Sequence, residues 1–124
     1  MNREILFRGQ RLDNDEWAYG DLLHLPNGDV VILSDKGYTK VKPKTIGQFT
    51  GLTDKNGNKI FEGDIVHGYW NTKFLIFFDL CCLQFRAKLS DGTEKDIDYY
   101  GDSKKIEVIG NIYDSPELLR SENE

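Results

Sequence analysis

The sequence has little cysteine and little histidine: Cys81, Cys82, His24 and His67 are the full set. A disulfide framework needs cysteines spread along the chain with Cα atoms about 4.4–6.8 Å apart, and neighbours on a strand point to opposite faces. Cys81 and Cys82 are therefore not expected to bond to each other. The histidines lie at no spacing typical of metal ligands. We expect no disulfide, no metal site and no cofactor, with reduced thiols as in a cytoplasm.

Long hydrophobic runs are also missing. No apolar stretch approaches the ~20 residues of a membrane helix, and the N-terminus does not resemble a secretory signal. The net charge of -5 argues against a general nucleic-acid binder. We expect a cytoplasmic protein with no membrane partner. Its 124 residues suit one domain, residues 1–124, which can be divided into an N-terminal β lobe (1–46) and a barrel-like lobe (47–124).

Catalytic motifs are missing too, including phosphate-binding loops, dinucleotide fingerprints and the nucleophile elbow. The run from Asp54 to Asn58 begins like a calcium loop, but Lys59 and Ile65 stand where an EF-hand needs Gly and Glu. Cys81 and Cys82 lie in the apolar run 80–83, which we interpret as a buried strand that quenches thiol reactivity. His67 is expected as a half-exposed strand residue and not as part of an acid–base cluster with Glu62 and Asp64. We predict a protein that is not an enzyme.

What the sequence does contain is a β pattern, with turn signals about every 8–12 residues that favour an all-β barrel or sandwich. Pro26-Asn27-Gly28 predicts a tight type I′ hairpin. Residues 74–78 read as a strand buried on both faces, residues 34–45 as a connection, and Ser115-Pro116-Glu117 as the capped start of a short C-terminal helix. Further strands are expected at 4–8, 17–23, 29–33, either side of Asn56-Gly57 within 49–61, and at 65–70, 84–89, 94–100 and 106–113.

Charge is unevenly distributed. Residues 36–59 contain six lysines and one Asp, which gives a local net charge of +5. The charges of residues 91–102 sum to −4. The two regions could meet between copies of the chain, or they could be separately solvated loops. The candidate interaction patch is Lys36, Lys40, Lys42 and Lys44. Six aromatic residues could add a stacking platform for single-stranded nucleic acid, or could belong to the core or an interface: Trp17, Tyr19, Tyr38, Trp70, Tyr99 and Tyr100.

Three segments carry a more specific signal: residues 4–9 (EILFRG), 48–66 (QFTGLTDKNGNKIFEGDIV) and 107–119 (EVIGNIYDSPELL). In this order and spacing they resemble the YopX family of phage and prophage proteins, over essentially the whole chain. The resemblance implies a phage or prophage protein of a bacterium, a β-rich fold with an SH3-like barrel component, and self-assembly. It brings no biochemical activity and no catalytic residue to transfer.

The polar and glycine residues of these segments are interpreted as structural. Glycines stand where the chain must bend, Asn56-Gly57 predicts a turn, and carboxylates flanking Gly63 can accept main-chain N–H bonds. Gly110 suggests a bulge or a close main-chain approach, and Asn111 can bond its own backbone. The alternative is a binding surface. The residues concerned are Gly51, Asn56, Gly57, Glu62, Gly63, Asp64, Gly110 and Asn111.

Taken together, the sequence predicts a non-enzymatic phage or prophage protein in the cytoplasm of a bacterial host. We expect it to be a self-assembling adaptor or protein-interaction module, whose partners are itself and a host or phage protein. The alternative hypothesis is a nucleic-acid-binding module that uses the lysine-rich segment.

Overall fold

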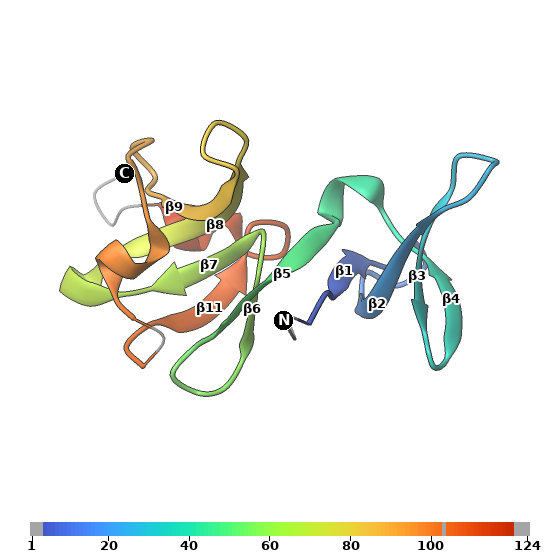
Figure 1. The fold of residues 1–124 in the computed structure, drawn as a ribbon, viewed down its shortest axis with the longest axis horizontal. Coiled ribbons are helices and arrows are strands. Elements are labelled where there is room, and N and C mark those ends of the chain that lie inside the picture. The colour runs from blue at the N-terminus through green and yellow to red at the C-terminus, as the bar shows by residue number, and fades with distance from the viewer. Residues whose placement is uncertain (1–3, 103, 121–124) are drawn as a thin grey trace. The chain divides into compact units, whose positions relative to one another are not determined.

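The computed structural model describes residues 4–102 and 104–120 and shows an all-β protein (Figure 1). Its helices are short 3-10 turns, so the all-β prediction is confirmed. The chain divides into two compact units, residues 1–51 and 52–124. The division falls inside β5 (Gly47–Thr53), whereas the lobes expected from the sequence divide just before this strand. No helix in the described residues is long and apolar enough to cross a membrane.

The first unit is an antiparallel sheet with strand order β4-β3-β2-β1-β5. Its elements are β1 (Phe7–Gln10), β2 (Trp17–His24), β3 (Val30–Ser34), β4 (Gly37–Lys40), η1 (Pro43–Thr45) and the start of β5. The first half of β2 pairs with β1 and the second half pairs with β3. Gly20 stands at this changeover, where a Cβ atom would lie 2.1 Å from the Leu33 carbonyl oxygen. The small core centres on Val30, Ile32 and Val41.

The β2–β3 hairpin exists, but its turn is not type I′. That turn needs positive φ at both central residues, and here Gly28 has φ 95° while Asn27 is not in the positive-φ region. Pro26 fixes a negative φ, and Gly28 N–H donates to the Leu25 carbonyl at 3.0 Å. The loop is therefore a type I turn closed by a left-handed glycine.

The expected connection over residues 34–45 is also wrong, because it contains β4 and η1. Gly37, at φ 100°, reverses the chain after β3. The following residues then pair with that strand, with Tyr38 opposite Leu33 and Lys40 opposite Val31. The four-residue strand is too short to give a periodic apolar signal in the sequence.

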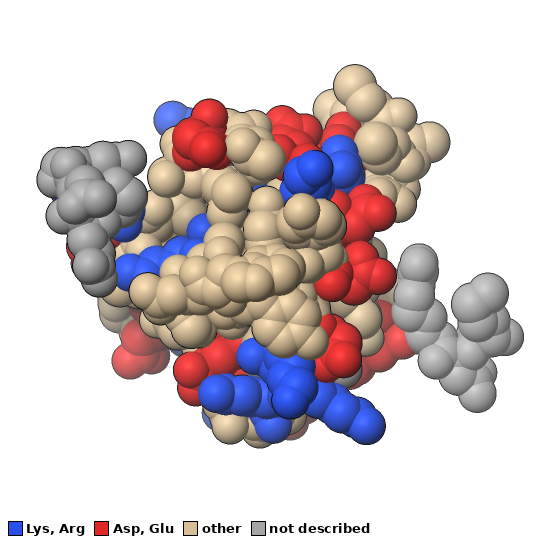
Figure 2. All heavy atoms as spheres, turned by 90° about the vertical axis from the view of Figure 1, so that its left-hand side faces the viewer, with Lys and Arg blue, Asp and Glu red and all other residues tan. Residues whose placement is uncertain are grey.

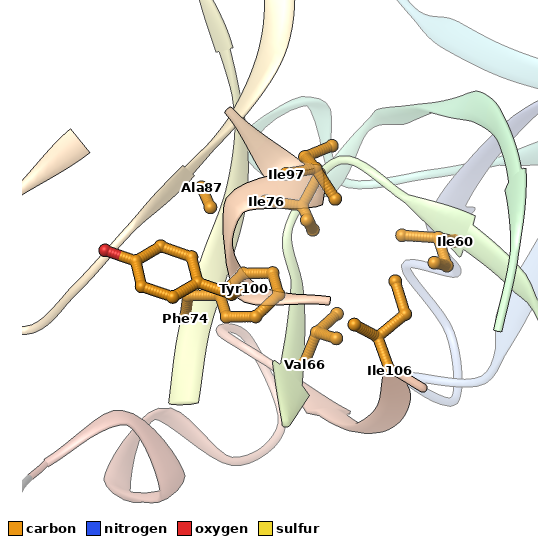
Figure 3. Close-up of a cluster of buried hydrophobic side chains, with 8 residues drawn as sticks. All are labelled: Ile60, Val66, Phe74, Ile76, Ala87, Ile97, Tyr100 and Ile106. Carbon is orange, nitrogen blue, oxygen red and sulfur yellow. The ribbon is translucent and has the colours of Figure 1, made fainter. Parts of the chain in front are cut away.

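The second unit holds a five-stranded antiparallel sheet with order β10-β9-β8-β7-β11. Strand β6 (Lys59–Phe61) pairs with β5. The remaining elements of this unit are β7 (Asp64–His67), η2 (Tyr69–Asn71), β8 (Lys73–Asp79), β9 (Gln84–Lys88), β10 (Glu94–Lys95), η3 (Ile97–Tyr100), β11 (Glu107–Asn111) and η4 (Pro116–Leu119). Figure 3 shows its core, formed by Ile60, Val66, Phe74, Ile76, Ala87, Ile97, Tyr100 and Ile106. The Phe74 and Tyr100 rings stack at 5.2 Å. The SH3-like barrel component stays a prediction.

Several strands of this unit differ from the sequence expectation. Strand β8 is not buried on both faces: Phe74 and Ile76 are buried, whereas Leu75 and Phe77 on the other face are only partly buried. The strand expected at 65–70 ends at His67 and is followed by η2, and the strand expected at 94–100 becomes β10 and η3. The C-terminal helix is a 3-10 turn, and the Ser115 side chain makes no capping hydrogen bond.

The interpretation of residues 80–83 as a buried strand is wrong. They form the turn between β8 and β9, and Cys81 and Cys82 are free and exposed. The Asp79 carboxylate creates this turn by accepting hydrogen bonds from the Cys81 N–H at 2.9 Å and the Cys82 N–H at 3.4 Å. Local desolvation and the nearby Asp79 carboxylate raise the pKa of the Cys82 thiol. This thiol is therefore a poor nucleophile although it is exposed.

Candidate functional site: an exposed aromatic surface

Three aromatic side chains lie exposed on η2 and η3 of the second unit. We call Tyr69, Trp70 and Tyr99 the aromatic surface; they are 39%, 74% and 53% exposed. The ring centroids of Tyr69 and Trp70 are 5.6 Å apart, and those of Trp70 and Tyr99 are 6.2 Å apart. Figure 2 views the molecule from the side on which the coiled segments η2 and η3 lie in Figure 1, and shows a broad uncharged area bordered by acidic and basic groups.

The two segments that carry the aromatic surface are held against each other. Gly68, just before η2, lies so close to η3 that a Cβ atom would be 2.2 Å from the Tyr100 carbonyl oxygen. Tyr100 is 4% exposed and anchors η3 in the core through its stack on Phe74. Close packing of this kind fixes the backbone and therefore fixes the directions in which the exposed rings point.

Trp70 also sits on unfavourable backbone. Its φ is 60° and ψ is 29°, and the next residue, Asn71, has φ 55°. The left-handed conformation costs about 1–2 kcal/mol for most L-residues, although Asn tolerates it. The Asn71 side chain is held by a hydrogen bond between its Oδ1 and His67 Nε2 at 2.8 Å. Strained residues of this kind cluster at functional sites, so Trp70 is the leading candidate for a contact residue.

Charged groups beside the aromatic surface are largely engaged with each other. Lys95 Nζ lies 5.0 Å from the centre of the Tyr99 ring, within cation–π range. Glu94 pairs with Lys88 at 3.6 Å, and Asp96 accepts from Arg86 Nε at 3.3 Å. These contacts neutralise part of the acidic segment 91–102.

The four candidate lysines all lie in the first unit. Lys36 is in the β3–β4 turn, Lys40 ends β4, Lys42 follows it and Lys44 lies in η1. Lys40 pairs with Asp29 at 3.2 Å, and Lys42 pairs with Asp15. The remaining lysines of the segment, Lys55 and Lys59, belong to the second unit, so the lysines of the +5 segment are divided between the two units.

The six aromatic residues considered from the sequence are also divided. Trp17, Tyr19 and Tyr38 belong to the first unit, and the others to the second, where Tyr100 is core. In the first unit an open groove of about 480 Å³ brings aromatic and charged groups together. It is lined by Arg11, Glu16, Trp17, Ala18, Tyr19, Ser34, Asp35, Lys36, Tyr38 and Thr39.

The Asp54 carboxylate holds the motif turn together and ties it to β11. Sequence reasoning did not single out Asp54 for this role. It is 4% exposed. Its Oδ1 accepts from the main-chain N–H groups of Asn56 at 2.9 Å and Asn58 at 2.8 Å, and its Oδ2 accepts from Val108 N–H at 2.9 Å. Burial pushes the pKa of Asp54 up, but the hydrogen bonds outweigh it and the pKa is lowered. An Asp two residues before Asn-Gly is the signal of such a turn.

The other motif residues shape the backbone as well. The Asp64 Oδ2 accepts from Phe61 N–H at 2.7 Å. Strand β11 is bulged between Val108 and Gly110, and a Cβ atom on Gly110 would lie 2.7 Å from Leu118 Cδ1. The Asn111 Oδ1 accepts from two main-chain N–H groups that follow it. Gly51, Gly57 and Gly63 have φ of 92°, 82° and 96°, and Glu62 is partly buried beside Gly63.

The described residues, 4–102 and 104–120, contain no group of three or more His, Cys, Asp or Glu side chains placed to hold a metal ion. His67 is a partly exposed residue at the end of β7, as expected, and Asp64 at the other end of that strand is 2% exposed.

Comparison with known proteins identifies the family of the chain. A family model described as YopX protein matches residues 6–120. The chain belongs to the YopX family. A comparison with curated proteins found no match. Among solved structures, the crystal structure of protein EF1440 from Enterococcus faecalis is similar, with 22% identity, a TM-score of 0.60, and coverage of 96% of this chain and 100% of that chain.

The similarity to the Enterococcus protein concerns the fold. The segments that carry the YopX resemblance from residue 48 to 66 and from 107 to 119 lie inside the matched range. In the structure they meet through the bond between Asp54 and Val108, which ties the motif turn to β11. This YopX motif is therefore accounted for by folding, whereas the aromatic surface is a feature that folding does not explain.

Proposed function

We propose that this YopX-family protein is a non-enzymatic protein-interaction module, which associates with itself and with a host or phage protein. The aromatic surface is the observation that carries this proposal. Trp and Tyr are enriched among the residues that dominate binding energy at protein interfaces. A Trp that is 74% exposed in a left-handed conformation lowers stability without adding core packing, which favours a role in recognition.

Rigidity of the aromatic surface supports the same proposal. Because the Gly68–Tyr100 approach fixes η2 against η3, little conformational entropy would be lost when a partner covers the rings. Family membership supports a phage-type protein, and we propose that it acts in the cytoplasm of the bacterial host.

The test is affinity capture from infected or lysogenic cells, with and without nuclease. Wild-type protein is expected to retain its protein partner after nuclease treatment, and Trp70→Ala is expected to lose it. Leu80→Ala is the matched control, because Leu80 is an equally exposed apolar residue of the same unit, at 78%, outside the aromatic surface. Equal recovery by Trp70→Ala and wild type contradicts the assignment of the aromatic surface.

A second candidate function is nucleic-acid binding by the first unit. The groove that brings Trp17, Tyr19 and Tyr38 beside Lys36 favours it, because aromatic stacking and cationic groups are the elements of single-strand recognition. Retardation of single- and double-stranded DNA and RNA at about 50 mM salt tests it. Replacing Lys36, Lys40, Lys42 and Lys44 by Ala should lower both the affinity and its salt dependence. No retardation at micromolar protein rejects this alternative.

A further inference from the structure

Two outer strands that lie beside charged side chains are the starting point. β4 is the outer strand at one end of the first sheet, and β10 is the outer strand at one end of the second sheet. Outer strands present main-chain N–H and C=O groups that can pair with another chain. We call β4 with Lys36 the basic edge, and β10 with Asp96 the acidic edge.

On the basic edge, the main-chain groups of Tyr38 point away from the sheet. Val41 N–H donates to the Val30 carbonyl at 3.2 Å, which fixes the alternation of bonded and non-bonded pairs along β3 and β4. By that alternation Thr39 bonds to β3, whereas Tyr38 and Lys40 face outward. The Lys40 carbonyl accepts from Leu12 N–H at 3.2 Å beside the Arg11–Val41 bridge, so the Lys40 end of the edge is already bonded within the chain and Tyr38 is the residue offered for pairing.

On the acidic edge, the same alternation identifies Glu94 as the residue whose main-chain groups point away from the sheet. Leu89 N–H donates to the Thr93 carbonyl at 2.9 Å, and Glu94 stands opposite Lys88 with Lys95 opposite Ala87. Lys95 therefore bonds to β9, and the main-chain groups of Glu94 face outward.

On β4, Tyr38 and Lys40 share one face, and Lys36 lies in the turn just before the strand. Glu94 and Asp96 contact Lys88 and Arg86, which share one face of β9. Like charges directly opposite each other are destabilising, so two basic edges or two acidic edges should not pair. A basic edge and an acidic edge satisfy each other in both main-chain bonding and charge.

We propose that the basic edge of one copy pairs with the acidic edge of a second copy. In antiparallel pairing Tyr38 stands opposite Glu94, so a sheet continues from one molecule into the next. Lys36, in the turn before β4, then lies at the same end of the contact as Asp96, which follows β10. The exposed ion pairs that Lys40 and Glu94 make within each chain are weak and can exchange. The contact joins two different surfaces, which generates a ring or an open chain of copies. This inference rests on the self-association in the proposed function and names its interface.

The decisive experiment uses two charge-reversed proteins and measures mass by light scattering at about 100 μM. Lys36→Glu/Lys40→Glu leaves both edges acidic, and Glu94→Lys/Asp96→Lys leaves both edges basic. Wild type should exceed 14.3 kDa. Each variant alone should associate at least about tenfold more weakly, and an equimolar mixture should recover assembly, because every basic edge then meets an acidic one.

Controls separate the interface from net charge and from folding. Lys104→Glu/Lys105→Glu makes the same change in charge as the first variant at exposed residues that belong to neither edge, and should assemble like wild type. Tyr38→Pro removes an outward N–H and should lose assembly, whereas Tyr38→Ala keeps that N–H and should retain it. Amide spectra confirm that each variant is folded.

The outcomes are distinguishable. A wild-type protein that is monomeric at about 100 μM overturns self-association and the edge pairing with it. An oligomer that both reversed proteins still form, or a mixture of them that does not assemble, overturns the edge pairing alone and leaves the aromatic surface as the site of contact.

Discussion

Replacing Asp54 by Asn tests how the YopX motif stabilises the second unit. The carboxylate lies inside the turn 54–58 and accepts from Asn56, Asn58 and Val108. Asn keeps the shape and one acceptor oxygen, but places an N–H₂ group where Oδ2 meets the Val108 N–H. That main-chain donor then has no acceptor, and the remaining bonds lose their charge.

The cost should be about 2–4 kcal/mol, since a bond to a charged group contributes about 1.5–3 kcal/mol and an unsatisfied buried donor costs about 1–3 kcal/mol. For a unit of this size the Tm should fall by roughly 10–30 °C. The pH dependence has a definite sign. Because the pKa of Asp54 is lowered in the folded state, its contribution is present above the ordinary Asp range and is lost as the pH falls through the folded pKa. The difference between the two proteins should therefore shrink in acid.

Residue-resolved urea unfolding measures this, with the amide signals of Val66 and Ala87 reporting on the second unit and that of Val31 on the first. Asp91→Asn is the control, because Asp91 makes a similar bond to Thr93 N–H in an exposed turn of the same unit. A loss below about 0.5 kcal/mol for Asp54→Asn, or a difference from wild type that does not change between pH 7 and pH 3, would refute the reasoning.

Three further substitutions have definite expected results. Gly68→Ala should destabilise the second unit by about 1–3 kcal/mol in urea, because its Cβ would meet the rigid Tyr100 main chain at 2.2 Å, and a neutral result contradicts the fixed approach of η2 and η3. Gly110→Ala should cost less than about 1 kcal/mol, because it meets the flexible end of Leu118, and should cost nothing in a Leu118→Ala background. Leu83→Asn should raise stability by about 0.5–1 kcal/mol, since Asn tolerates the φ of 55° at this position; Leu80→Asn, at another exposed residue of the same turn, should not, and equal effects would count against the strain.

Much of the architecture follows from the sequence because each turn is determined by the residues within it. Asn56-Gly57, Gly63 and Pro26-Asn27-Gly28 mark reversals that the structure contains, and the apolar runs between them become strands. Such signals need only the residues of the turn itself. Some polar residues of the YopX segments likewise act on neighbours close in sequence, as Asn111 does, whereas the bond from Val108 to Asp54 joins two distant segments and could not be predicted.

The misses share a different cause, since each depends on a partner distant in sequence or on a side chain that overrides a pattern. Strand β4 exists because β3 offers it an edge, and four residues carry no periodicity. The Leu-Cys-Cys-Leu run reads as core, yet the Asp79 carboxylate holds it as a turn, and Arg86 seven residues later pairs with that carboxylate at 3.2 Å. Hydropathy alone does not record such a bond.

Trp70 and Tyr99 are among the aromatic residues considered from the sequence, but their placement together with Tyr69 could not be predicted, because a strand residue and a residue in a strained turn look alike in sequence. Trp70 follows a β-forming run, so pattern alone continues the strand, whereas Gly68 ends it by approaching Tyr100. Trp70 then occupies a conformation that Gly or Asn would adopt at lower cost, with its ring in solvent. Glycines and buried carboxylates elsewhere in the chain agree with the backbone they occupy, whereas Trp70 and Leu83 conflict with it, and Trp70 lies beside two further exposed aromatic rings. A residue that conflicts with local preference and gains no burial is best explained by what it contacts outside the chain, and this is why function is assigned to η2 and η3 and not to the YopX motif turn.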